Sequence, residues 1–103
     1  MPPIEMEGLL TKAQYRIFET KQFIKDFNKI KGKTQQKLKT KLYEYVYPQF
    51  RKEPHFGNNI KKLVNWNPDT WRYRIGKNRL FYEIDEKEKI VFIDTIDTRG
   101  KAY

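Results

Sequence analysis

The stretch that decides the fold runs from residue 70 to residue 103 and reads TWRYRIGKNRLFYEIDEKEKIVFIDTIDTRGKAY. Residues 70–75 alternate large apolar side chains with arginines, and residues 79–85 alternate apolar and polar side chains in the same way. A period of two is typical of a β-strand with one buried face. Because Gly76-Lys77-Asn78 lies between the two runs and offers turn chemistry, the pattern predicts a β-hairpin.

A third strand is expected directly after this hairpin. Residues 86–88 are charged and indicate a second turn, and residues 89–98 follow with the sequence KIVFIDTIDT. The apolar run in that segment favours a central strand that is covered on both faces. The C-terminal third of the chain is therefore predicted to be a three-stranded β-meander.

The N-terminal half predicts one strand and two helices. Residues 13–19 alternate in polarity and are short enough for a first strand. Thr20 can cap a helix, and Gly32 is expected to end it. The apolar positions of that helix are Phe23, Ile24, Phe27 and Ile30. A second amphipathic helix is expected from Lys33 until Pro48 ends it, which makes an αα-hairpin with one apolar face.

The whole chain is expected to form one small α+β domain. Its element order would be β-α-α-β-β-β, an antiparallel-rich sheet with the αα-hairpin packed on one face. Residues 48–67 contain Pro, Gly and Asn, and are expected to be an irregular connection with at most a turn of helix. Residues 1–12 predict a mobile lead-in or a short extra segment, so the domain proper would span residues 13–103.

Positive charge is concentrated in the middle of the chain. The net charge is +9, and residues 21–47 carry eight lysines against two acidic residues. Residues 48–83 carry eight basic residues against three acidic ones. A surface that faces a polyanion, above all a nucleic acid, follows from this distribution. The alternative for any single lysine is an ordinary solvated face that keeps a small protein in solution.

Several classes of function are disfavoured by composition. The chain has no cysteine and a single histidine, His55, without ligand spacing around it, so neither a catalytic triad nor a zinc site is expected. We expect no cofactor. No apolar run approaches the length of a membrane span, and residues 1–12 carry acidic residues where a signal peptide carries positive charge. A cytoplasmic protein without membrane contact is therefore expected.

The meander gathers guanidinium groups. Arg72 and Arg74 share one face of their strand, and the hairpin brings Arg79 to the start of the next strand. Guanidinium groups bind phosphate oxygens in a bidentate manner and could stabilise the charge of a phosphorane-like transition state. In the alternative, the arginines form a surface lattice of ion pairs with nearby acidic residues. Those residues would be Glu83, Asp94 and Asp97.

The last residues add an arginine and a tyrosine. Arg99 and Tyr103 follow the third strand directly. Nearby cations would lower the pKa of the tyrosine hydroxyl from about 10 and let it exchange a proton. The alternative is that Tyr103 is only a hydrophobic plug. The basic residues expected to contact RNA beyond the arginines are Lys61, Lys62, Lys77 and Lys101.

The C-terminal third of the chain resembles the C-terminal half of RelE/ParE-superfamily toxins, on the RelE side. The resemblance lies in the run W-R-Y-R-I-G-x-x-R-L-x-Y-E-I-D, followed by a turn, an apolar strand and then D-T-R-G-K-A-Y. The specific part covers residues 71–103, about a third of the chain. The resemblance implies a toxin of a type II toxin-antitoxin pair that cuts mRNA, usually on the ribosome. The implied chemistry uses the RNA 2′-hydroxyl without a metal, and the implied partners are mRNA, the ribosome and an antitoxin.

The resemblance also assigns roles. Arg72, Arg74, Arg79 and Arg99 would bind phosphate and stabilise charge, and Tyr103 would transfer a proton. Members of the superfamily often carry lysine at the first two positions and histidine where this chain has Thr98. Two other hypotheses therefore stay open. One is a ParE-like inhibitor of DNA gyrase, and the other is a basic module that binds RNA or protein without catalysis.

Overall fold

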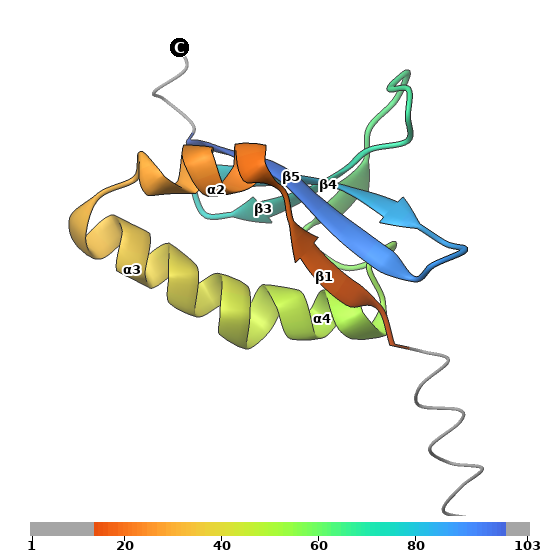
Figure 1. Cartoon of the computed structure of the whole chain (residues 1–103), viewed down its shortest axis with the longest axis horizontal. Helices are drawn as coiled ribbons and strands as arrows, with labels where there is room; N and C mark the ends of the chain where they lie inside the picture. Colours follow the sequence, from red (N-terminus) through yellow and green to blue (C-terminus); the bar gives the residue numbers. More distant parts are fainter. Residues whose placement is uncertain (1–13, 99–103) are drawn as a thin grey trace, which may run out of the picture.

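The computed structural model describes residues 14–98, and Figure 1 shows a sheet with helices packed against it. The strands are β1 (Arg16–Glu19), β2 (Ile60–Lys62), β3 (Trp71–Ile75), β4 (Asn78–Asp85) and β5 (Ile90–Thr98). They lie in the order β1-β5-β4-β3-β2, and β1 pairs with β5 in parallel while the other pairs are antiparallel. The predicted meander and the antiparallel-rich α+β domain are confirmed.

The hairpin forms as the sequence predicts. Ile75 pairs with Asn78, so Gly76 and Lys77 are the two loop residues. Gly76 has a φ of 58°. A positive φ at the first loop position is typical of a type II′ turn, whose twist matches that of the strands. The alternation is also confirmed, because Trp71, Tyr73 and Ile75 are buried.

The helices are α2 (Lys21–Asn28), α3 (Gly32–Lys41), the π-helical turn η1 (Leu42–Val46) and α4 (Tyr47–Lys52). The Thr20 hydroxyl caps α2 by accepting a hydrogen bond from the Phe23 backbone N–H at 3.1 Å. Two expected boundaries were wrong. The first helix ends at Asn28, and Gly32, with a φ of 65°, starts the next helix instead of ending the first.

The second wrong boundary is Pro48, which lies in the first turn of α4 instead of ending a helix. A proline inside an α-helix removes one hydrogen bond and clashes with the preceding turn. Here η1 precedes it, and the wider π-helical turn lets the chain continue past the proline. As a result α3, η1 and α4 form one long helical arm (Figure 1).

Residues 48–67 also contain a strand that the sequence pattern did not predict. β2 is only three residues long, and its partner is β3. Such a short edge strand has too few residues for alternation to show. Pairing with β3 rather than local pattern therefore defines it.

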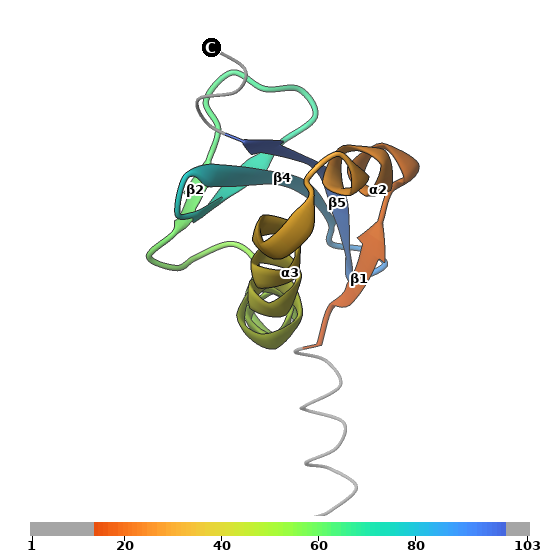
Figure 2. The ribbon, with the colours of Figure 1, turned by 90° about the vertical axis from the view of Figure 1, so that its left-hand side faces the viewer.

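The core lies between the sheet and the helical arm, and Figure 2 shows α3 on one side of the sheet with α2 beside β5. Phe50 of α4 is fully buried, with ring centroids 4.3 Å from Tyr82 and 5.5 Å from Tyr73. The buried Tyr82 hydroxyl donates to the Pro54 carbonyl at 2.7 Å, so its polar atom is satisfied. β5 is an interior strand, although β4 is the central one.

Candidate nucleic-acid interface

The face of the sheet opposite the core carries three arginines. Register places Arg74 directly opposite Arg79, and Arg72 opposite Phe81. Residues directly opposite on antiparallel strands share a face, and the core residues of β3 project to the other side. The structure therefore brings Arg72, Arg74 and Arg79 together, and this side of the sheet is called the arginine face below.

The three guanidinium groups influence one another. Burial lowers the pKa of Arg72 from its usual value, and the charges of Arg74 and Arg79 lower it further. The Arg72 Nε atom is buried and has no hydrogen-bond partner within residues 14–98. A cluster of cations that destabilise one another gains most when an anion binds.

Arg79 is the one arginine of this face for which the ion-pair alternative holds. Its guanidinium lies 2.5 Å from the Asp97 carboxylate, and both side chains are 29% exposed. The guanidinium also lies 5.8 Å from the centre of the Phe81 ring. Within residues 14–98, neither Arg72 nor Arg74 forms a salt bridge, so the predicted ion-pair lattice does not extend to them.

The lysines expected at RNA are divided between the two faces. Lys61 pairs with Arg72 and therefore lies on the arginine face. Lys62 pairs with Trp71, lies 5.4 Å from the centre of its ring and binds Asp69 at 3.3 Å. Lys77 is exposed at the tip of the hairpin.

Arg99, Lys101 and Tyr103 lie outside the described residues. β5 ends at Thr98, which pairs with Asn78 beside the Arg79–Asp97 pair. The roles assigned to these three residues remain predictions.

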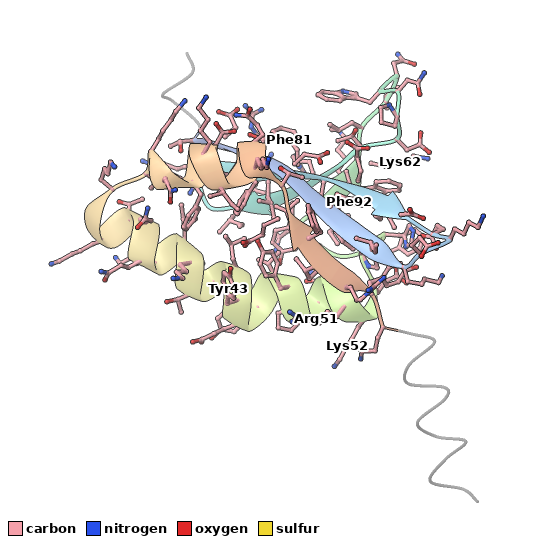
Figure 3. The ribbon with its side chains drawn as sticks, in the orientation of Figure 1. Tyr43, Arg51, Lys52, Lys62, Phe81 and Phe92 are labelled. Carbon is pink, nitrogen blue, oxygen red and sulfur yellow. The ribbon has the colours of Figure 1, made fainter. Side chains whose placement is uncertain are left out.

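A cavity of about 960 Å³ borders the arginine face. Its walls are the end of α2 with the following turn, the loop before β3, and β4 with β5. Its charged and aromatic lining consists of Asp26, Lys29, Lys31, Trp66, Phe81, Glu83, Asp94 and Asp97. We call it the Trp66 cavity. Figure 3 shows Phe81 on the side of the sheet away from Tyr43 of the helical arm.

Two carboxyl groups of the Trp66 cavity interact strongly. A β-bulge leaves Asp94 without a partner on β4, because Phe81 pairs with Thr95 and Tyr82 pairs with Ile93. Burial, a hydrogen bond to Glu83 and the charge of Glu83 raise the pKa of Asp94 to about 8. Asp94 is therefore protonated near neutral pH.

The sequence pattern indicated Glu83 and Asp94 only as ion-pair partners of the arginines, and it contained no signal for Trp66. The alternation of Arg79, Phe81 and Glu83 on one face of β4 was a usable signal for Glu83. The bulge at Asp94 and the loop that carries Trp66 have no comparable pattern in the sequence.

His55 belongs to a different site. Its Nδ1 atom lies 2.8 Å from Glu53, and its Nε2 atom contacts Glu86 in the turn after β4. Arg79 lies at the opposite end of β4. The only histidine of the chain therefore does not complete the arginine face. Within residues 14–98, no group of three or more acidic or histidine side chains could hold a metal ion, and no helix could span a membrane.

Residues 17–103 match the family model described as the ParE toxin of the type II toxin-antitoxin system parDE. The chain belongs to this family. It is thus a type II toxin of the RelE/ParE superfamily, as the motifs of the meander predict. No curated protein sequence matches the toxin.

Solved structures of RelE proteins share the toxin's fold. The RelBE2 complex of Mycobacterium tuberculosis aligns with a TM-score of 0.68 at 22% identity, over 86% of the toxin and 95% of that chain. The isolated Escherichia coli RelE toxin aligns with a TM-score of 0.61 at 21% identity, over 84% of the toxin and 86% of that chain. The RelE-RelB complex of Pyrococcus horikoshii aligns with a TM-score of 0.55 at 23% identity, over 85% of the toxin and 98% of that chain.

Proposed function

We propose that this toxin is an endoribonuclease that cuts mRNA on the ribosome and thereby inhibits translation. The observation that carries the proposal is the arginine face, where Arg72 and Arg74 form no salt bridge within residues 14–98 and Arg79 lies opposite Arg74. Guanidinium groups in this arrangement suit a phosphodiester, which offers them several oxygens at once.

The proposed reaction uses the substrate's own nucleophile. The RNA 2′-oxygen bonds to the adjacent phosphorus while the bond from phosphorus to the 5′-oxygen breaks. The 2′-hydroxyl proton passes to a base, and the leaving 5′-oxygen takes up a proton. The products are a 2′,3′-cyclic phosphate and a 5′-hydroxyl, so the reaction needs no metal-bound water.

The roles follow from chemistry. Arg72, Arg74 and Arg79 hold the phosphate and stabilise the charge that builds on its oxygens in the transition state. Arginine is a poor general base, because its pKa lies above about 12. We therefore assign proton transfer to Tyr103 and a further phosphate contact to Arg99.

The test is cleavage of mRNA in a translation reaction with purified ribosomes, followed by mapping of the new 5′ ends. Arg74→Ala should reduce cleavage about 100-fold, by analogy with the loss of one transition-state contact. Arg51→Ala is the matched control, because Arg51 is exposed on α4 and lies with the helical arm, away from Phe81, in Figure 3. Uncut mRNA with wild-type toxin that still binds ribosomes contradicts the proposal.

Tyr103→Phe separates catalysis from binding. Under the proposed function, this variant binds RNA as the wild type does and cleaves it far more slowly. If growth inhibition and RNA affinity are both unchanged, the toxin acts as a non-catalytic basic module.

A second candidate is inhibition of DNA gyrase, which the ParE description of the matching family favours. Both candidates use the same fold, so the target must be tested directly. A supercoiling assay with purified gyrase decides between them: gyrase-dependent DNA breakage together with intact mRNA selects the second candidate.

We further propose an antitoxin partner, since two of the similar RelE structures are complexes with RelB-type antitoxins. An acidic segment that covers the arginine face would complement the net charge of +9 and block substrate. Coexpression of an acidic protein encoded by a neighbouring gene should relieve growth inhibition and copurify with the toxin.

A further inference from the structure

The Trp66 cavity and the arginine face share a border. Phe81 lines the cavity and is the register partner of Arg72. Asp97 also lines the cavity, and its carboxylate binds Arg79. A phosphate held by the arginines would therefore lie beside the cavity.

One wall of the cavity is aromatic. The Trp66 ring stacks on Phe81 with ring centroids 6.1 Å apart and an angle of 12° between the planes. Trp66 is nevertheless 53% exposed, so much of its surface remains available. A hydrogen bond of 2.9 Å from the Leu63 N–H to the Thr70 carbonyl closes the base of the loop that carries it. Exposed aromatic rings beside a basic surface are the usual stacking platforms for single-stranded bases.

The floor of the cavity is acidic, in contrast to the arginine face. Glu83 and Asp94 lie there, and Asp26 enters from α2, where it accepts a hydrogen bond from Thr95. Carboxylates repel a phosphate and accept hydrogen bonds from amino groups. Lys29 adds positive charge at the α2 side.

We propose that the Trp66 cavity binds one unstacked RNA base beside the phosphate held by the arginine face. Trp66 stacks on the base, and Glu83 with Asp94 accepts a hydrogen bond from its exocyclic amino group. Adenine, cytosine and guanine carry such a group, whereas uracil presents a carbonyl oxygen in its place. The toxin should therefore prefer an amino-bearing base over uracil at this position. The inference rests on the proposed function and specifies its substrate.

The experiment measures binding separately from cleavage. Fluorescein-labelled hexanucleotides of adenosine, cytidine and uridine with 2′-O-methyl groups cannot be cleaved by attack of the 2′-oxygen, and their affinities follow from fluorescence anisotropy. The adenosine and cytidine hexamers should bind about tenfold more tightly than the uridine hexamer, as one well-placed contact to a base edge provides.

Two variants assign the preference to the cavity. Trp66→Ala should weaken binding of every hexamer about tenfold, because stacking on an aromatic ring depends little on base identity. Glu83→Gln should remove the difference between adenosine and uridine hexamers, because an amide can donate to the uracil carbonyl, which a carboxylate cannot do. The matched controls are Val64→Ala, exposed in the same loop, and Glu44→Gln, exposed on the helical arm; neither residue lines the cavity.

Equal affinity of the wild-type toxin for the three hexamers overturns the inference, as does a preference that survives Glu83→Gln. These outcomes differ from failure of the proposed function. If the toxin leaves mRNA intact but shows the base preference, the base-binding role of the cavity stands and the proposed endoribonuclease activity is wrong. If the toxin cleaves mRNA but shows no base preference, the proposed endoribonuclease activity stands and the base-binding role of the cavity is wrong.

Discussion

Asp97 and Asp94, both on β5, modulate the charge of the arginine face and of the Trp66 cavity beside it. Asp97 binds Arg79 and so reduces the positive charge available to a phosphate. Asp94 lies at the bulge, and its raised pKa keeps it protonated near neutral pH. Asp97 thus offsets part of the positive charge of the arginine face, whereas protonated Asp94 reduces the negative charge of the neighbouring cavity.

Asp97→Asn should separate stability from binding. The substitution removes a partly buried, charge-assisted hydrogen bond, so the free energy of unfolding should fall by about 1 kcal/mol. Affinity for single-stranded RNA should rise, because the Asp97 carboxylate no longer offsets positive charge at Arg79. Urea unfolding and anisotropy with RNA measure the two effects, and weaker RNA binding would contradict this role of Asp97.

The raised pKa of Asp94 predicts how stability depends on pH. Its pKa rises from an ordinary value of 3.8 to about 8 on folding, so the native state binds more protons than the unfolded state between these values. This contribution to stability is complete below about pH 4 and is lost as the pH rises through about 8. The melting temperature of wild type should therefore fall from pH 6 to pH 9 more than that of Asp94→Asn. Equal slopes would show that Asp94 titrates normally.

Among the elements, α4 is the part of the helical arm that packs against the centre of the sheet. Its aromatic residue Phe50 contacts Tyr82 of β4 and Tyr73 of β3, the strands that carry the arginines on their other face. The same strands therefore bury aromatic rings on one side and present guanidinium groups on the other. Loss of packing at α4 should consequently loosen the arginine face.

Phe50→Ala tests this coupling. Removal of a fully buried ring should cost about 3–5 kcal/mol, a large share of the stability of a small domain. Tyr45→Ala, at a neighbouring position that is 66% exposed, should change stability by less than about 0.5 kcal/mol. Urea unfolding compares the two variants. A small effect of Phe50→Ala would mean that α4 does not support the sheet as the structure indicates.

Across the whole molecule, the basic residues behind the net charge of +9 lie on different surfaces and are expected to have different roles. The exposed lysines of α3 lie on the helical arm, whereas Arg72, Arg74, Arg79 and Lys61 share the opposite side of the sheet. General attraction to RNA should come from the whole charge, and positioning of the phosphate from the arginine face.

The salt dependence of RNA binding can separate these contributions. Each phosphate neutralised on single-stranded RNA changes the slope of log affinity against log salt by about 0.7. Arg74→Ala should therefore reduce the slope by about 0.7, and Arg51→Ala should change it much less. RNA titrations between roughly 50 and 300 mM salt measure this slope. Equal slopes for both variants would assign binding to net charge alone.

Local patterns in the sequence were sufficient to predict several elements. Alternation in residues 70–85 defines two strands and places Arg72 with Arg74, Gly76 defines the turn, and Thr20 caps the first helix. These features depend on the geometry of a few consecutive residues, which side-chain pattern and backbone preference encode directly.

The remaining features depend on how distant segments pack together. The tertiary structure paired β2 with β3, which places Lys61 and Lys62 on opposite faces, and it joined Arg79 to Asp97. It also formed the Trp66 cavity from segments far apart in the chain. Register and cavity shape depend on contacts between distant residues, and a one-residue shift would move every side chain of a strand to the other face. A local pattern does not contain that information.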